Sequence, residues 1–349
     1  MEGKKAAHPK IKLLMIFILG SISLAFLIIL SLSTGTGFNS MSLTNTLGAL
    51  SHLIENGLEA SSTYELVILN LRMPRTLAVI AVGVGLAVAG SAMQALIRNP
   101  LVDPYITGVS SGAALGATLA MLAGITVTEI SSYSIPIMAF LGAVGAFLFT
   151  MLLAEAAGGR PINYVLGCMI VSIALQAGTT LLIYFNTDKL HGVLFWLFGS
   201  FAYVEWKSTL IIIIVVAVLA LVMLLFAKEF NVILLGDEQA KQLGMNVRRF
   251  KTTMFMIVSA MAAVCVAFTG VIGFVGLIVP HLVRMVVGGD HRLLLPASMM
   301  LGANVLLVAD IVCKTAVAPS ELPIGAIISI IGAPFFGYLM VRVGKEYVM

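Results

Sequence analysis

The chain has 349 residues, of which 60% are hydrophobic and 10% are charged, and its mean hydropathy is +1.08. A soluble domain carries about 25% charged residues, so this composition excludes an ordinary water-soluble globular protein. The formal charge of +4 is interpreted through membrane orientation and not as a sign of nucleic-acid binding.

The chain is expected to be an all-α membrane protein. Its apolar runs are about 20 residues long and do not alternate with polar residues, which suits spanning helices and not barrel strands. In lipid, every backbone amide and carbonyl group needs an internal hydrogen bond, and a helix provides it. About ten spans are predicted, at 11–32, 66–96, 105–123, 134–154, 163–186, 207–227, 250–269, 277–288, 294–315 and 325–343.

The first span follows a lysine-rich segment, residues 1–12. A cleaved signal peptide is the competing interpretation, but the apolar run is too long for one and residues 31–36 form a poor cleavage site. With this segment in the cytoplasm, 15 of the 20 Lys and Arg residues fall on the cytoplasmic side, as the positive-inside rule requires. Both termini are therefore predicted to be cytoplasmic, and residues 1–349 to form one multi-pass domain of the cytoplasmic (inner) membrane.

Two arginines flank a proline at the outer end of the second span, in the sequence Asn70-Leu-Arg-Met-Pro-Arg75. Arg72 and Arg75 are three positions apart, so they share a face if this turn is helical. Two interpretations stay open: the arginines anchor the span at the membrane surface, or they form a docking point for an acidic patch on an external protein.

The inner end of the same span runs from Gln94 to Pro104 and contains two prolines, which stop the helix in a tight turn. Gln94, Asn99 and Leu101 are the gate candidates here, because a bulky and a polar side chain on a rigid turn could constrict a pathway. A well-capped turn without that role is the alternative.

Small residues mark the third span. Gly108, Gly112 and Gly116 recur every four residues and predict a stripe along which helices pack closely. A short element near residues 192–200 is expected at the outer interface, where Trp196 and Trp206 fit an aromatic belt.

The longest cytoplasmic connection spans residues 228–249. Its middle, Asp237 to Leu243, has helical composition, and Gly244 is a plausible C-cap. The short polar helix predicted here is either part of a solvated loop or a docking helix for a cytoplasmic partner.

The chain lacks several kinds of chemistry. No GxxxxGK[ST] phosphate loop occurs in the sequence, so ATP use by that route is excluded. The five histidines are dispersed and the three cysteines lie in apolar runs; we therefore expect no metal site, no cofactor and no disulfide framework. Asp310 is the acid placed well within a span, and Lys314, four residues later, is expected to pair with it.

At these motifs the chain resembles the permeases of binding-protein-dependent importers for iron-siderophore, haem and cobalamin, the FecCD-type or type II ABC importers. The resemblance covers nearly all of the chain past residue 70. The matching stretches are 72–117, 196–206, 234–247, 270–298 and 321–336.

The resemblance implies a ten-helix subunit that works as a homodimer in the lipid bilayer, with two cytoplasmic ATP-binding subunits and one extracytoplasmic substrate-binding protein. It implies that Arg72 and Arg75 meet carboxylates of the binding protein, and Lys314 stands where many relatives carry Arg. It implies that the stretch LGDEQAKQLG seats in the ATPase, through residues Asp237, Glu238, Gln239, Ala240 and Gly244, and that Asn99 and Leu101 lie in the cytoplasmic gate region.

Under this resemblance the chain is not an enzyme, and its cargo is an iron chelate (siderophore or haem) or cobalamin. An ion-coupled secondary transporter is the alternative, although it needs acids at midplane and the sequence offers Asp310 alone. A receptor or scaffold would need a larger soluble segment than any connection here provides.

Overall fold

The computed structural model describes residues 9–35, 41–57, 59–124, 133–186 and 190–346, and within them it is all-helical. Each of the ten predicted spans coincides with a helix, which confirms the predicted architecture. In the described part of the chain, seven helices are long and apolar enough to cross a membrane, and three shorter apolar helices accompany them. The spanning helices are α1 (Pro9–Ser33), α4 (Met73–Ile97), α5 (Val109–Ala123), α6 (Ser134–Ala156), α7 (Pro161–Tyr184), α9 (Trp206–Leu225), α12 (Val247–Thr269), α13 (Val275–Val287), α14 (His291–Thr315) and α15 (Ile324–Glu346).

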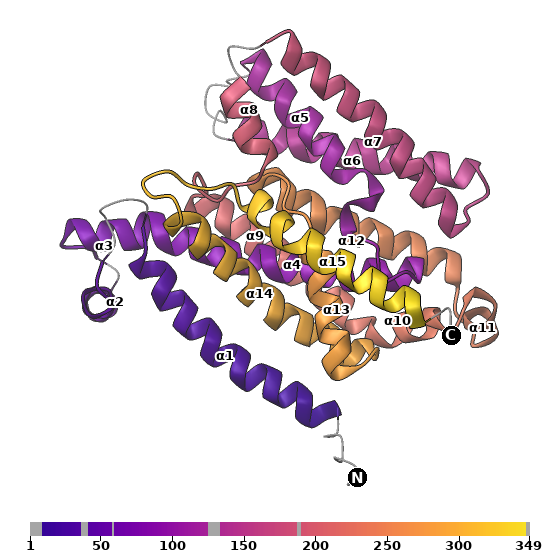
Figure 1. Ribbon diagram of the computed structural model, residues 1–349, viewed down its shortest axis with the longest axis horizontal. Helices are drawn as coiled ribbons and strands as arrows, with labels where there is room; N and C mark the ends of the chain where they lie inside the picture. Colours follow the sequence, from indigo (N-terminus) through magenta and orange to yellow (C-terminus); the bar gives the residue numbers. More distant parts are fainter. Residues whose placement is uncertain (1–8, 36–40, 58, 125–132, 187–189, 347–349) are drawn as a thin grey trace.

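Helix α4 is the central rod of the molecule (Figure 1). It continues α3 (Thr63–Val67) and the π-helical turn η2 (Ile68–Arg72), and it packs against α9, α12, α13 and α14. Its glycines allow this close approach: a Cβ atom on Gly83 would meet the carbonyl oxygen of Gly302, and one on Gly90 would meet that of Gly276. In lipid, where apolar burial gives little net drive, such backbone-to-backbone contact is a main source of helix association.

A second group of helices, α5, α6, α7 and α8 (Leu190–Leu197), lies together beside the α4 group (Figure 1). A Cβ atom on Gly112 would meet the carbonyl oxygen of Gly142, and one on Gly116 would meet that of Met138. The position of Gly108 differs from the prediction, which placed it inside the third span. Helix α5 begins one residue after Gly108, at Val109. Gly108 is its N-cap, with a φ of 82°, and follows the short 3-10 turn η3 (Pro104–Thr107).

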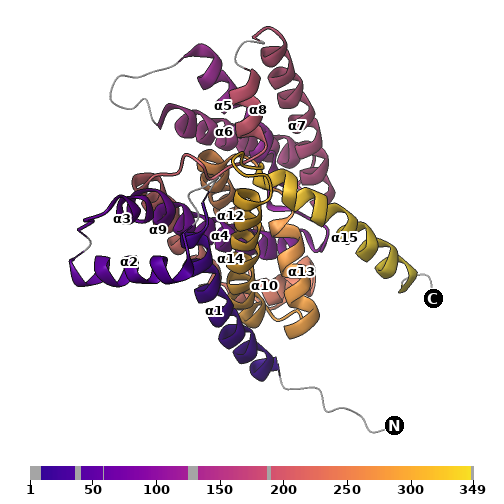
Figure 2. The same ribbon diagram turned by 60° about the vertical axis from the view of Figure 1, so that its left-hand side comes forward.

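Two helices were not anticipated. Helix α2 (Leu43–Glu55) follows α1 and runs across the direction of the spans (Figure 2); the cap Ser42, whose side chain accepts a hydrogen bond from the amide of Asn45, was its signal. Helix α10 (Ala227–Leu234) occupies the start of the expected loop, because Ala227, Phe230 and Ile233 form a buried face. The short helix α11 (Asp237–Gln242) follows it, close to the predicted bounds.

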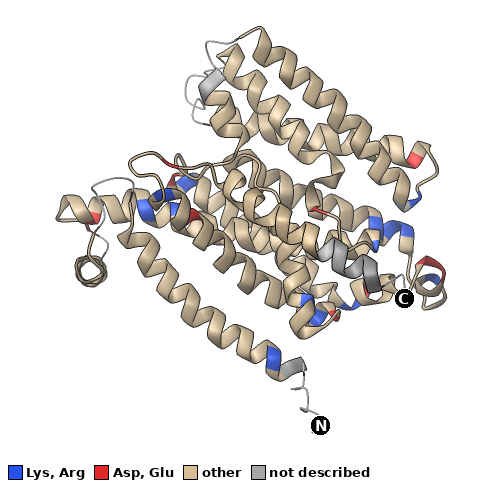
Figure 3. Cartoon of the chain, in the orientation of Figure 1, with Lys and Arg blue, Asp and Glu red and all other residues tan. Residues whose placement is uncertain are grey.

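Charged residues gather at the two ends of the bundle (Figure 3). One end carries α10, α11, the first described turn of α1 and the last turns of α15 (Figure 1); we call it the α11 end. The opposite end carries α2, α3, η2 and the segment between α14 and α15. The long helices between these ends bear mostly apolar side chains, as a spanning bundle requires.

Candidate functional site

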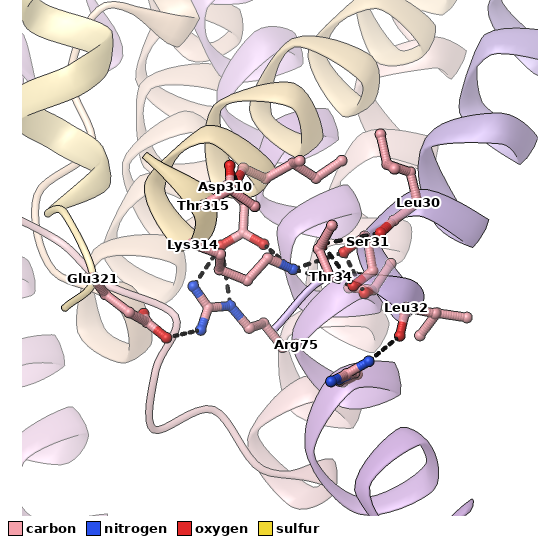
Figure 4. Close-up of polar contacts among 12 residues, drawn as sticks. Leu30, Ser31, Leu32, Thr34, Arg75, Asp310, Lys314, Thr315 and Glu321 are labelled. Carbon is pink, nitrogen blue, oxygen red and sulfur yellow. Dashed lines mark hydrogen bonds and ion pairs between the residues drawn. The ribbon is translucent and has the colours of Figure 1, made fainter. Parts of the chain in front are cut away.

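Some of the predicted site residues lie in two charged groups, one at each end of the bundle. At the end opposite α11, Arg75 lies in the first turn of α4 and contacts two carboxylates (Figure 4). Its Nε and Nη2 donate to Asp310 Oδ1 at 3.0 and 2.8 Å, and its Nη1 donates to Glu321 Oε1 at 2.7 Å. Lys314 Nζ lies 3.0 Å from Asp310 Oδ2 and donates to Ser31 Oγ at 2.9 Å.

These four charged residues, Arg75, Asp310, Lys314 and Glu321, form what we call the Arg75 cluster. Its formal charge is zero, and the exposed fraction of its side chains rises from 1% for Asp310 and 5% for Lys314 to 12% for Arg75 and 18% for Glu321. Buried charged side chains need opposite charges and hydrogen bonds, because desolvation of an unpaired ion costs roughly several kcal/mol. The cluster therefore fixes α1, α4, α14 and the segment before α15 to one another.

Arg72 lies outside this cluster. It belongs to the π-helical turn η2, and its Nη1 donates to the carbonyl oxygens of Leu32 and Ser33 at 2.6 and 3.1 Å, at the end of α1. The two arginines thus contact different helices: Arg72 bonds to the end of α1, and Arg75 bonds to Asp310 on α14. The turn that carries both arginines is helical, as the prediction required, but their side chains bond to different segments of the chain.

Among the three predicted docking residues, Arg72 and Lys314 are buried, with exposed fractions of 7% and 4%. Arg75 and its partner Glu321 lie nearest to the surface. The predicted i,i+4 pair between Asp310 and Lys314 is confirmed. Three of the five N–H donors of Arg75 are used by Asp310 and Glu321, and its side chain is 12% exposed, so little of it is open to an external carboxylate.

At the α11 end, one carboxylate joins three segments. Arg98 Nη2, at the end of α4, lies 3.0 Å from Asp237 Oδ1. Lys251 Nζ, on α12, donates to both oxygens of Asp237, at 2.9 and 2.8 Å. We call Arg98, Asp237 and Lys251 the Asp237 bridge. It connects α11 to the end of α4 and to α12.

The rest of α11 presents a polar face. Ala240 is buried in the core and anchors the helix, whereas Glu238, Gln239 and Leu243 are exposed. Lys241 Nζ donates to Glu238 Oε1 at 2.8 Å, and this carboxylate raises the pKa of Lys241.

The C-cap of α11 differs by one residue from the prediction. Leu243 is the C-cap, and Gly244 follows it with a φ of 86°, a conformation that glycine adopts without strain. Its amide donates to the carbonyl oxygen of Lys241 at 2.9 Å, which ends the helix.

The gate candidates occupy two environments. Gln94 is 2% exposed, accepts a hydrogen bond from Arg284 Nη2 at 3.1 Å, and directs its Nε2 to carbonyl oxygens at the start of α13. Asn99 and Leu101 lie in the exposed turn after α4, where Asn99 Oδ1 accepts from the Leu101 amide at 2.9 Å. Gln94 thus ties α4 to α13, and only the other two side chains are free to line an opening.

Three residues of these sites were not singled out from the sequence: Glu321, Arg98 and Lys251. Arg75 and Glu321 are separated by 246 positions, so no local spacing predicts their contact. The sequence does carry a signal for Arg98. It directly precedes Asn99-Pro100, at the end of a predicted helix where glycine is the common residue, so an arginine there is unusual. All three cysteines are buried and free, as expected.

A groove of about 400 Å³ lies between α1, α13, α14 and α15. Its walls are almost wholly apolar, and Phe274, Ile331 and Phe335 are typical of them. Such walls suit lipid or another helix; they offer no counter-charges for a charged metal chelate.

The fold and these charged ends define a polytopic membrane transport subunit without a phosphate loop of its own. The sequence matches the FecCD transport family over residues 23–342. It is 37% identical to the hemin transport system permease protein HmuU of Yersinia pestis, over 78% of this chain and 83% of that protein. It is 36% identical to the vitamin B12 import system permease protein BtuC of Escherichia coli O127:H6, over 80% and 85% of the two chains.

A solved structure described as an inward-facing conformation of a metal-chelate type ABC transporter superposes with a TM-score of 0.81. It is 32% identical and covers 96% of this chain and 100% of that chain. The chain therefore belongs to the FecCD transport family, whose members named here are permease subunits of ABC importers.

Proposed function

We propose that the chain imports an iron chelate, haem or cobalamin across the cytoplasmic membrane, with energy from separate ATPase subunits. The observation that carries this proposal is the family match over residues 23–342 together with relatives named for hemin and vitamin B12 import. The missing phosphate loop supports it, since the energy source must lie in another chain. In this proposal the chain catalyses no reaction; it moves cargo.

The working assembly is a homodimer that carries two cytoplasmic ATP-binding subunits and one extracytoplasmic substrate-binding protein. The α11 end faces the cytoplasm and so do both chain termini, in agreement with the excess of Lys and Arg predicted on that side. Helix α11 is the contact for the ATPase, because Glu238, Gln239 and Leu243 are exposed while Ala240 anchors the helix in the core.

The opposite end receives the binding protein. Arg72, Arg75 and Lys314 supply the positive charge there, and Arg75 is the cation that an incoming carboxylate can reach, by replacing Glu321. Electrostatic contacts of this kind set the orientation and rate of docking more than its affinity.

Transport then alternates between two openings. ATP-driven closure of the ATPase pair moves α11, and the turn with Asn99 and Leu101 opens or closes the cytoplasmic exit. Gln94 keeps α4 and α13 together during this change through its bond with Arg284. Gly112 and Gly116 keep α5 close to α6, so each helix pair moves as a unit.

Reconstitution tests the proposal. The chain is placed in proteoliposomes with its ATPase and binding-protein partners, and uptake of ferric siderophore, hemin and cobalamin is measured with ATP supplied on the side of the α11 end. We expect ATP-dependent uptake of one cargo class and none when the ATPase carries a disabled phosphate loop. Uptake of none of these chelates by an ATPase-bound chain would refute the proposed cargo.

An ion-coupled mechanism is less favoured by the geometry. Its best candidate, Asp310, is 1% exposed and already contacts Arg75 and Lys314. A carboxylate held between two cations does not exchange protons or bind a further ion readily. Collapsing the ion gradients of the proteoliposomes is therefore expected to leave ATP-driven uptake unchanged.

A further inference from the structure

We propose that Arg98 is a positioning residue that carries the movement of α11 to the turn containing Asn99 and Leu101. The inference rests on the proposed function and deepens it, since it names the contact through which the ATPase would reach the gate. Its basis is the Asp237 bridge and the backbone of the turn.

The backbone at Arg98 is unusual. Arg98 is the C-cap of α4 with a φ of 57°, in the left-handed region, and only one other described residue that is not glycine, Phe274, has a positive φ. Glycine occupies this conformation without steric strain, and a long side chain does not. A non-glycine residue held there is a reason to ask what its side chain does.

The Arg98 side chain reaches the beginning of α11. Its Nη2 lies 3.0 Å from Asp237 Oδ1, and its Nη1 lies 3.5 Å from the position that a Cβ atom on Gly236 would take. Gly236 has a φ of 115°, so the chain turns sharply just before α11 and leaves room for the guanidinium group. The arginine therefore contacts both the backbone bend and the first carboxylate of the helix.

The turn after Arg98 is closely hydrogen-bonded. The Asn99 amide donates to the carbonyl oxygen of Gln94 at 3.1 Å, and Asn99 Oδ1 accepts from the Leu101 amide at 2.9 Å. A displacement of Arg98 thus moves Asn99 and Leu101 together. Since Lys251 holds the other side of Asp237, α11, α12 and the turn at the end of α4 respond as one body.

The exposure of the pair makes its removal tolerable for the fold. The side chains of Arg98 and Asp237 are 32% and 33% exposed, so water can hydrate Asp237 when the guanidinium group is removed. An ion pair of this kind adds little to stability, which makes its loss detectable as a defect of coupling and not of folding.

The test uses the complete transporter in proteoliposomes and measures cargo imported per ATP hydrolysed. Arg98→Gly is the decisive variant, because glycine suits the left-handed backbone and removes only the side chain. We expect the ratio to fall at least about five-fold, the lower range of allosteric coupling factors. Arg98→Lys, which keeps a charge, is expected to restore part of the ratio.

Arg292→Gln is the matched control. Arg292 forms an exposed ion pair with Asp290 at the same end, 2.7 Å between Nη2 and Oδ2, and the hydrogen bonds of its side chain go to Asp290. Its ratio is expected to match that of the unmodified transporter. An unchanged ratio in Arg98→Gly, with normal ATPase co-purification, would overturn the inference; failure of the unmodified chain to bind an ATPase would instead refute the proposed function.

Discussion

The two ends of α4 carry charged groups of opposite character. The Arg75 cluster at its start is buried, neutral and enclosed by four segments, and its central carboxylate is 1% exposed. The Asp237 bridge at its end leaves a third of Arg98 and Asp237 in contact with solvent. Both groups connect elements distant in sequence, but only the second can exchange its partners for water.

This difference assigns them different tasks. A buried ion pair loses its partner at a high cost, because the remaining charge stays desolvated. An exposed pair contributes about 0–1 kcal/mol, so it can couple the movement of two elements without deciding whether the chain folds. We therefore attribute structural rigidity to the Arg75 cluster and transmission of movement to the Asp237 bridge.

The largest expected effect is that of Asp310→Asn. Removing this charge leaves Arg75 and Lys314 as two buried cations with one carboxylate, Glu321, and we expect a loss of about 3–5 kcal/mol in the free energy of unfolding. Unfolding in detergent, followed by circular dichroism, measures it. Arg98→Gln at the other end is the matched comparison: it removes the exposed pair but leaves Asp237 bonded to Lys251, so the expected loss is about 1 kcal/mol or less; equal losses would contradict the distinction.

Gly90→Ala tests whether α4 is the rigid connection between the two groups. The added methyl group meets the carbonyl oxygen of Gly276, so α4 and α13 must separate. We expect a loss of about 1–3 kcal/mol in the free energy of unfolding. Gly145→Ala on α6, where a Cβ atom would meet nothing within 4 Å, should be neutral or slightly stabilising. The same loss in both variants would indicate a general effect of alanine.

Glu321→Gln probes the exposed edge of the Arg75 cluster. The variant gives the cluster one net positive charge and replaces the charged partner of Arg75 with a neutral amide, so an acidic surface should bind more tightly, by about ten-fold in Kd or roughly 1.4 kcal/mol. Titration of the purified binding protein against the permease in nanodiscs measures it. Weaker or unchanged binding would remove the idea that an external carboxylate replaces Glu321.

The smallest effect is expected for Glu238→Gln on the exposed face of α11. The pair that it forms with Lys241 has exposed fractions of 82% and 57%, and solvent screens such pairs strongly. The midpoint of thermal unfolding should not change measurably, although binding of the ATPase should weaken. A large drop in the unfolding midpoint would mean that the Glu238 side chain, and not Ala240 alone, contributes to the stability of the fold.

Hydropathy, together with the Gly, Pro and charged residues between the apolar runs, predicted the ten spans well, because composition and length determine which segments can span a membrane. Helix α10 was missed because its apolar face covers only three residues within a polar connection. The pair of Asp310 and Lys314 followed from helical spacing. The contacts of Arg75 with Asp310 and Glu321, 235 and 246 positions away, depend on how α14 and the segment after it fold back, which no local pattern encodes.

Distance measurements by electron paramagnetic resonance test the account most directly. Spin labels at exposed positions Leu71 and Val317 report on the Arg75 end, and labels at Leu101, Leu243 and Leu152 report on the α11 end. When ATP is added to the assembled transporter, the distance from Leu71 to Val317 and that from Leu101 to Leu243 should stay constant, while Leu101 moves relative to Leu152. Movement of Leu243 without Leu101, or a change across the Arg75 cluster, would contradict the account.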